Sequence, residues 1–214
     1  MNATYLLSAL GAGGAAATGA YLTKDHWMPS HEQKVKSIEE ALKGRKLISS
    51  LEGNSLTKQW EVEFESDSNE IKTLLGNSSL NAQTGGVELS KWCSRKMPLD
   101  VDKNQDVFEK VEKYCLIRSV ASQLARKQKT LLKEGQTSEW QATYKKRKDT
   151  SAKRSDLGLE GDSWTEDKQN EDLPKVKAWC TSNSEKEFLA SPEGTDSLYT
   201  KVLKWCTKEG ANES

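Results

Sequence analysis

The stretch SLYTKVLKWCT, Ser197–Thr207, decides the fold that we expect, because a similar stretch occurs earlier in the chain. That earlier stretch, DVFEKVEKYCL, occupies Asp106–Leu116. When Cys206 is aligned with Cys115, five further positions carry the same or similar residues: Tyr199 and Phe108, Lys201 and Lys110, Val202 and Val111, Lys204 and Lys113, Trp205 and Tyr114. Apolar residues recur in both stretches at the spacing of an amphipathic helix. The chain therefore contains two versions of one helical element.

A second cysteine precedes each version of this element, and it also follows a tryptophan. These dipeptides are Trp92-Cys93 and Trp179-Cys180. Disulfides Cys93–Cys115 and Cys180–Cys206 would each join two consecutive helices and would require an oxidising, exported location. The alternative is four reduced cysteines packed beside aromatic residues in the core. Because the pairs recur, we favour these two disulfides, while the sequence leaves other pairings of the four cysteines open. No Cys-x-x-Cys spacing indicates a zinc knuckle.

The order of the helical segments is also repeated. Trp60 and Phe64 are four residues apart, as are Trp140 and Tyr144 later in the chain. The segment Trp60–Phe64, WEVEF, alternates like a strand, but Trp140–Tyr144 does not alternate, which favours a helix for both. We predict an all-α fold in which an N-terminal apolar helix precedes a helical domain built from two diverged repeats. The predicted parts are a signal peptide or membrane anchor helix (1–23), a helical stalk or linker (24–50), repeat 1 (51–117), repeat 2 (118–208) and a disordered tail (209–214).

The segment Ala3–Leu22 has no charged residue and is about as long as a helix that crosses a bilayer. Small residues at Gly11, Ala15 and Gly19 share one helical face, which suits close helix packing in a membrane. We therefore expect residues 3–22 to contact the membrane. Lysines after this segment favour a cytoplasmic body, whereas disulfides require an exported one, so its orientation stays open. A cleaved signal would lack the usual basic residues before its apolar run.

Local patterns predict the following elements of the body. A short helix ends at Gly76, and a polar loop over residues 77–86 leads into a helix at Val87–Met97. A longer helix starts at Asp106 and extends toward Lys133. Pro174 is expected in the first turn of a later helix.

The composition indicates a small core and a strongly charged surface. Of the 214 residues, 30% are charged, lysine and arginine balance aspartate and glutamate at 32 each, and seven are tryptophan. Basic residues dominate Arg126–Arg154 and acidic ones dominate Asp156–Asp172. The acidic segment cancels the charge of the basic one, so we expect two solvated, mutually attracting surface segments and no nucleic-acid partner.

Patterns typical of enzymes are missing from the sequence. There is no phosphate-binding loop, no serine nucleophile elbow and no zinc-binding His-Glu helix. His26 and His31 are five residues apart, which does not suit a metal site on a helix. We therefore expect a protein without catalytic residues, cofactor or metal, and we identify no small-molecule substrate.

The repeated motifs and the apolar start together resemble the uncharacterised paralogous proteins of haemotropic mycoplasmas. The matching pieces are Met1–Leu22, Leu89–Cys93, Val107–Cys115, Val176–Cys180 and Leu198–Cys206. The resemblance implies a surface or secreted protein that contacts the host or varies as an antigen. The expected partner is then a host surface protein. The alternative is a membrane-tethered scaffold that faces the cytoplasm.

Overall fold

The computed structural model describes residues 36–161, 164, 168–190 and 197–213. Within these residues every regular element is a helix, and the only β-type pairings are isolated bridges. The predicted all-α fold is confirmed for this part of the chain. The expected apolar helix and most of the expected stalk lie outside the described residues, and no described helix is both long and apolar enough to cross a membrane.

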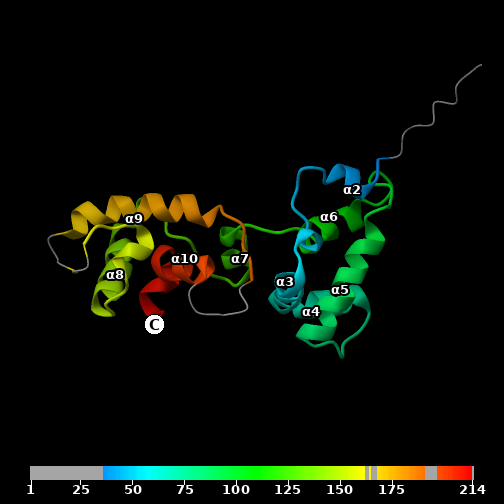
Figure 1. Cartoon of the computed structure of the whole chain (residues 1–214), viewed down its shortest axis with the longest axis horizontal. Helices are drawn as coiled ribbons and strands as arrows, with labels where there is room; N and C mark the ends of the chain where they lie inside the picture. The colour runs from blue at the N-terminus through cyan, green and yellow to red at the C-terminus, as the bar shows by residue number, and fades with distance from the viewer. Residues whose placement is uncertain (1–35, 162–163, 165–167, 191–196, 214) are drawn as a thin grey trace, which may run out of the picture. The chain divides into compact units, whose positions relative to one another are not determined.

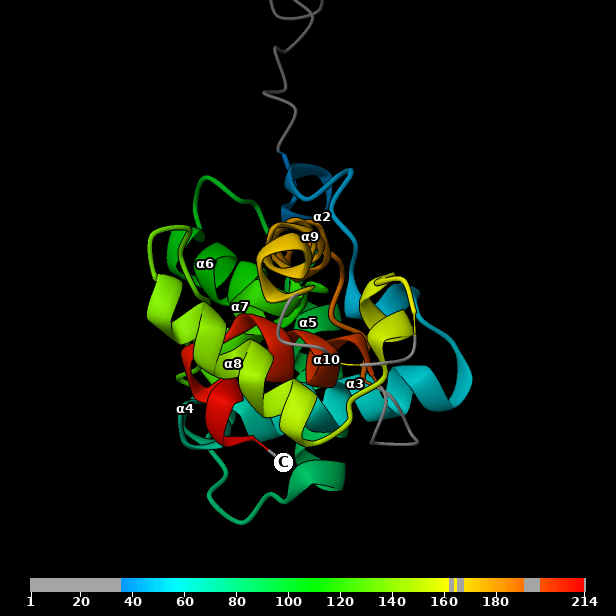
Figure 2. The same ribbon diagram turned by 90° about the vertical axis from the view of Figure 1, so that its left-hand side faces the viewer.

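Two groups of helices each enclose a hydrophobic core (Figure 1). The first group contains α2 (Ile38–Ala41), η1 (Ile48–Ser50), α3 (Gly53–Ser66), α4 (Ser68–Leu75), α5 (Ala82–Lys96) and α6 (Gln105–Tyr114). The second contains α7 (Val120–Arg126), α8 (Thr137–Asp149), η2 (Arg154–Leu157), α9 (Gln169–Ser184), α10 (Leu198–Cys206) and η4 (Lys208–Asn212). In Figures 1 and 2, α10 lies beside both α8 and α9.

Polar side chains fix the ends of several helices in the first group. Ser37 and Glu40 form a reciprocal capping box at the start of α2, and Asn81 forms one with Thr84 at the start of α5. Helix α4 ends at Gly76, whose left-handed backbone (φ 66°) suits glycine. The predicted end of this helix is therefore confirmed.

Helix α5 begins earlier than the sequence predicts, and residues 82–86 of the expected loop are helical. The reason is the close approach of α3. A Cβ atom on Gly86 would lie 2.9 Å from the backbone of Trp60 and Glu61, and one on Gly85 would lie 2.3 Å from the Phe64 ring. The two glycines therefore act as a contact surface for α3, where any side chain would collide.

The described part of the expected stalk packs into the first core. Ile38 and Ile48 are completely buried there, and Leu42 is 3% exposed. The backbone N–H of Ile38 donates to the carbonyl of Leu99 over 2.9 Å. Residues 37–50 thus belong to the first helical group by both packing and hydrogen bonding.

The predicted helix from Asp106 toward Lys133 is wrong beyond Tyr114, where α6 ends. Instead of continuing the helix, the backbone after Tyr114 pairs with a distant segment. Ile48 N–H donates to the Cys115 carbonyl over 2.9 Å, and Ile117 N–H donates to the Lys46 carbonyl over 2.8 Å. These bonds satisfy backbone groups that a longer helix would have satisfied internally.

The second core contains the same backbone arrangement at the end of α10. Leu132 N–H donates to the Cys206 carbonyl and Lys208 N–H donates to the Thr130 carbonyl, both over 2.8 Å. At the start of this group, Val120 N–H donates to the Lys186 carbonyl over 2.9 Å, as Ile38 does to Leu99. Corresponding segments of the two groups are therefore joined by corresponding hydrogen bonds.

Two further expectations about the second group differ from the structure. Pro174 lies inside α9 and not in its first turn, because the helix already begins at Gln169. The expected tail at 209–214 is helical over most of its described length, since η4 extends to Asn212. This short helix packs on α8, where the buried side chain of Arg147 donates to the Gly210 carbonyl over 3.0 Å.

Candidate functional site

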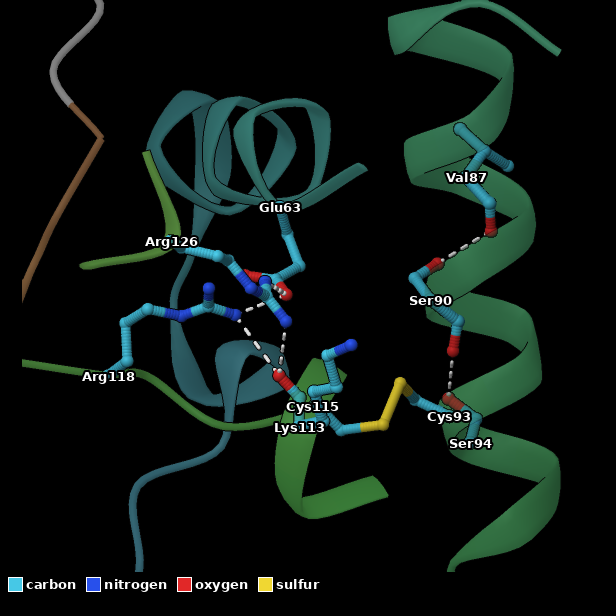
Figure 3. Close-up of a disulfide and its surroundings, with 9 residues drawn as sticks. All are labelled: Glu63, Val87, Ser90, Cys93, Ser94, Lys113, Cys115, Arg118 and Arg126. Carbon is cyan, nitrogen blue, oxygen red and sulfur yellow. Dashed lines mark hydrogen bonds and ion pairs between the residues drawn. A yellow bond between two sulfur atoms is a disulfide. The ribbon is translucent and has the colours of Figure 1, made fainter. Parts of the chain in front are cut away.

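All four candidate cysteines lie in the two expected pairs. Cys93 of α5 is joined to Cys115, directly after α6, with their Cα atoms 5.8 Å apart (Figure 3). Cys180 of α9 is joined to Cys206 at the end of α10, with a Cα separation of 5.6 Å. Each disulfide therefore joins the second-to-last α-helix of its group to the end of the last one or to the residue directly after it.

The aromatic residue before each cysteine contributes to the surrounding core. Trp92, Tyr114 and Trp205 are buried, and Trp179 is half-buried. The Trp205 ring stacks on Trp164 with a centroid separation of 5.7 Å. The Trp-Cys and Tyr-Cys dipeptides thus place a disulfide and a large apolar side chain in the same region of the core, which is how a chain with few aliphatic residues buries enough surface.

A buried charge cluster beside the first disulfide connects the two helical groups. Glu63 of α3 is 2% exposed, and its carboxylate accepts hydrogen bonds from the guanidinium groups of Arg118 and Arg126, the latter over 2.6 Å. Both guanidinium groups also donate to the Lys113 carbonyl, over 3.1 and 3.2 Å (Figure 3). Since Arg126 belongs to α7, this cluster links the first core to the second.

The polar edge of α3 makes further contacts with the second group. Gln59 donates to the Phe188 carbonyl over 3.3 Å and accepts from Ala190 N–H over 2.7 Å. Gln123 of α7 donates to the Ser66 hydroxyl over 2.9 Å. Gln59, Glu63 and Ser66 are spaced by three or four residues and therefore share one helical face.

Burial and neighbouring charges shift the pKa values of this cluster in opposite directions. Burial raises the pKa of the Glu63 carboxyl, and the guanidinium groups of Arg118 and Arg126 oppose that increase. Burial lowers the pKa of Arg118, whereas the charge of Glu63 raises it. Because two guanidinium groups occupy one carboxylate, the arrangement suits holding α3 against α7 more than binding a further ligand.

A second buried ion pair lies inside the second core. Arg154 donates to both carboxylate oxygens of Asp172, over 2.6 and 3.0 Å, and Tyr144 donates to the same carboxylate over 2.7 Å. Burial would raise the pKa of Asp172, but the hydrogen bonds from Arg154 and Tyr144 hold it below 3.8. Burial and, as the second cause, the hydrogen bond to Asp172 raise the pKa of Tyr144 to about 12.

This ion pair changes the expected picture of two solvated charged segments. Arg154 comes from the basic segment and Asp172 from the acidic one, but their side chains are only 2% and 4% exposed. Lys201 pairs with Asp156 over 2.8 Å at the edge of the same region. The segments do attract each other, as expected, but their strongest contact is a buried one within the core.

The surface has several hollows, and two contain clusters of basic side chains. A hollow of about 380 Å³ includes Arg45, Lys113, Arg118 and Arg126, all of which already contact a carboxylate. A hollow of about 360 Å³ between α8 and α10 includes Arg147, Lys153, Lys201 and Lys204. A smaller one, about 180 Å³, is lined by both cysteines of the second disulfide.

Sequence reasoning missed the buried charges Glu63, Arg147, Arg154 and Asp172, and the half-buried Arg118. The one local signal is that Glu63 follows Trp60 by three residues and directly precedes Phe64, so it borders the apolar face of α3, where a charge needs a partner. His26 and His31 lie outside the described residues. Among the residues that are described, no group of three or more histidine, cysteine, aspartate or glutamate side chains could hold a metal ion.

Comparisons with protein-family models, curated proteins and solved structures found no match to this chain.

Proposed function

We propose that this chain is an exported or membrane-anchored surface protein whose two disulfide-linked helical groups form a non-catalytic interaction module. The observation that carries the proposal is the pairing of all four cysteines, with one disulfide in each group. Such disulfides form and persist in oxidising compartments and are rare in the cytoplasm. The uncharged segment at residues 3–22 supplies the proposed signal or membrane contact.

We further propose that the two groups are diverged repeats. The matched backbone bonds support this, and they also suggest that the repeats begin at Ser37 and Ser119, each of which caps a helix. Aligning the first residues of α3 and α8, Gly53 and Thr137, places Trp60 opposite Tyr144. The sequence pattern instead pairs Trp60 with Trp140. With their first residues aligned, α3 and α8 also match in length, with 14 and 13 residues.

A role in host contact or antigenic variation fits the separation between buried core residues and charged surface residues. The cores are held by aromatic residues, disulfides and buried ion pairs, while most charged residues lie on the outer faces of the helices. Substitutions on such faces usually change stability little, so the surface can vary while the fold is retained. The resemblance to the paralogous proteins of haemotropic mycoplasmas supports the same proposal, with a host surface protein as partner.

Protease treatment of intact cells tests the surface location. Lysines and arginines are frequent along the chain, so trypsin should remove the body from intact cells while a cytoplasmic marker protein stays uncut. A body that resists trypsin on intact cells, but is cut after the membrane is permeabilised, contradicts display at the surface.

Peptide mapping without reductant tests the compartment and the pairing together. Lys96 and Lys110 lie between Cys93 and Cys115, and Lys186 and Lys201 lie between Cys180 and Cys206. Trypsin should therefore yield peptides that are joined only by the disulfides and separate on reduction. Complete alkylation of four free thiols in protein taken directly from cells would overturn the proposal.

The second candidate is a membrane-tethered scaffold that faces the cytoplasm. Lys24, Lys34 and Lys36 follow the apolar segment, and positive charge beside a membrane segment favours the cytoplasmic side. This candidate predicts free thiols and protection from external trypsin. The same two experiments therefore distinguish it from the surface protein.

A further inference from the structure

The hollow between the end of α8 and α10 contains an unusual concentration of positive charge. Among the described residues, it is lined by the basic side chains of Arg147, Lys153, Lys201 and Lys204 and by one carboxylate, Asp156, which pairs with Lys201 over 2.8 Å. Neither Lys153 nor Lys204 has a carboxylate of a described residue within ion-pair distance. The described residues that line the hollow thus carry a formal excess of three positive charges, and its volume is about 360 Å³.

Arg147 is the buried member of this group, and its hydrogen bonding is incomplete. The residue is 2% exposed, and one terminal nitrogen donates to the carbonyls of Gly210 and Glu213. Its Nε atom is buried and has no hydrogen-bond partner among the described residues. Buried charges in proteins are usually paired, so a guanidinium whose only hydrogen bonds go to two carbonyl oxygens, with the nearby Glu213 carboxylate already paired to Lys129, favours a further anion.

Glu63 and Arg147 are buried charges at corresponding helix positions, but they differ in their ion-pair partners. In the helix register proposed above, Glu63 of α3 corresponds to Arg147 of α8, and both side chains are 2% exposed. The charge of Glu63 is matched by Arg118 and Arg126 from the same chain. Arg147 makes no ion pair with a described residue, because the nearby carboxylate of Glu213 pairs with Lys129 over 3.0 Å. Three lysines surround the hollow that Arg147 lines.

The backbone at the edge of this hollow adds a second feature. Ser151, which also lines it, has a positive φ of 51°, a conformation that residues other than glycine rarely adopt. This conformation ends α8, because Ser151 N–H donates to the Lys148 carbonyl over 3.0 Å and Ala152 N–H donates to the Arg147 carbonyl over 2.9 Å. The hydroxyl group of Ser151 also lies along the wall and can donate a hydrogen bond.

We propose that this hollow binds the oxyanion of a phosphate or sulfate monoester, with Lys153 and Lys204 as its direct ligands and Arg147 as the buried charge beneath it. Lysine ammonium groups bind such oxygens through short, charge-assisted hydrogen bonds. The volume exceeds what an inorganic ion fills and lies within the usual range for small-molecule sites. The proposal goes beyond the interaction module above and does not depend on the compartment of the protein.

The test is calorimetric titration of the full-length chain at constant ionic strength. The probes are inorganic phosphate, inorganic sulfate, phenyl phosphate and phenyl sulfate, with chloride as the reference anion. We expect saturable binding of one ester per chain, and the stronger of the two esters identifies the source of the oxyanion. Titration curves for both esters that do not differ from chloride would overturn the proposal.

Matched double variants locate the site. Lys153→Gln with Lys204→Gln should weaken ester binding by at least about tenfold, because two charge-assisted hydrogen bonds are lost. Lys43→Gln with Lys72→Gln removes the same charge from the first helical group and should leave the affinity within about twofold. Equal weakening by both pairs would show attraction to net charge alone and would overturn the site. Lysine variants are preferable to Arg147→Gln, which also removes the bonds to η4.

Discussion

The guanidinium of Arg126 donates to the buried carboxylate of Glu63 over 2.6 Å and thereby joins α7 of the second helical group to α3 of the first. Arg118 contacts the same carboxylate, so one negative charge is shared by two positive ones. Gln59, one turn earlier on α3, binds the backbone at Phe188 and Ala190. One face of α3 therefore provides several polar contacts between the two groups, and Lys46 adds another by pairing with Glu187 over 2.7 Å.

Replacing Glu63 by glutamine should destabilise the fold strongly. The variant Glu63→Gln keeps the size of the side chain but leaves Arg118 and Arg126 without their carboxylate. Removing one partner of a buried ion pair typically costs about 3–5 kcal/mol, because the remaining charge is buried without compensation. Urea unfolding, followed by circular dichroism, measures the change in the free energy of unfolding.

The exposed pair of Glu88 and Lys91 provides the control for this prediction. These side chains are 41% and 56% exposed and lie 2.8 Å apart within α5. Glu88→Gln should leave the unfolding midpoint unchanged within error, since exposed ion pairs contribute little. If Glu63→Gln behaves like Glu88→Gln, then the buried cluster does not hold the two groups together.

Substitution of Gly86 by alanine should separate α3 from α5. A Cβ atom at this position meets the backbone of Trp60 and Glu61 at 2.9 Å, and backbone atoms cannot move aside as a side chain can. We expect a loss of about 1–3 kcal/mol, which is typical of overpacking. Gly135→Ala is the matched control, because no atom lies within 4 Å of a Cβ placed at this position and the φ of Gly135 is not positive. Equal stability of the two variants would contradict the close helix contact.

The features that could be predicted from the sequence are those with a local pattern. The helix that ends at Cys206 follows from the spacing of Leu198, Val202 and Trp205, and the paired cysteines follow from the recurrence of one motif. The end of α4 follows from Gly76. In each of these cases the decisive residues are close in sequence or occur twice.

The features that were missed depend on contacts between distant segments. Helix α6 ends at Tyr114 because the following backbone pairs with Lys46 and Ile48, which no pattern around Tyr114 reveals. The sequence predicts a loop at Gly85 and Gly86, since two adjacent glycines disfavour a helix unless another helix packs against them. The partners of Glu63 are more than fifty residues away.

Loss of either disulfide should destabilise its own helical group. The cysteines are separated by 22 residues in the first pair and by 26 in the second, and closing loops of this length contributes about 3 kcal/mol in the loop-entropy model. We expect the double variants Cys93→Ser with Cys115→Ser and Cys180→Ser with Cys206→Ser to lose similar amounts, measured by urea unfolding without reductant.

Reduction of the native protein provides the control for the disulfide variants. With dithiothreitol, the native protein should become about as unstable as a variant that lacks all four cysteines, and that variant should not respond to the reductant. A native protein whose unfolding midpoint is the same with and without dithiothreitol would contradict a stabilising role for both disulfides.

Acid should weaken the second core through Asp172. Because Arg154 and Tyr144 hold the pKa of Asp172 below its usual 3.8, the folded state binds a proton less readily than the unfolded state. The resulting stability is present above pH 3.8 and is lost as the pH falls through the lower pKa of the folded state. Asp172→Asn should therefore reduce the loss of stability between pH 5 and about pH 2. Tyr144→Phe, which removes one of the hydrogen bonds to the carboxylate, should reduce it by a smaller amount. Urea unfolding at several pH values measures how the free energy of unfolding of each variant changes with pH. If this dependence is the same for Asp172→Asn and for the native protein, the ion pair with Arg154 does not cause the acid sensitivity.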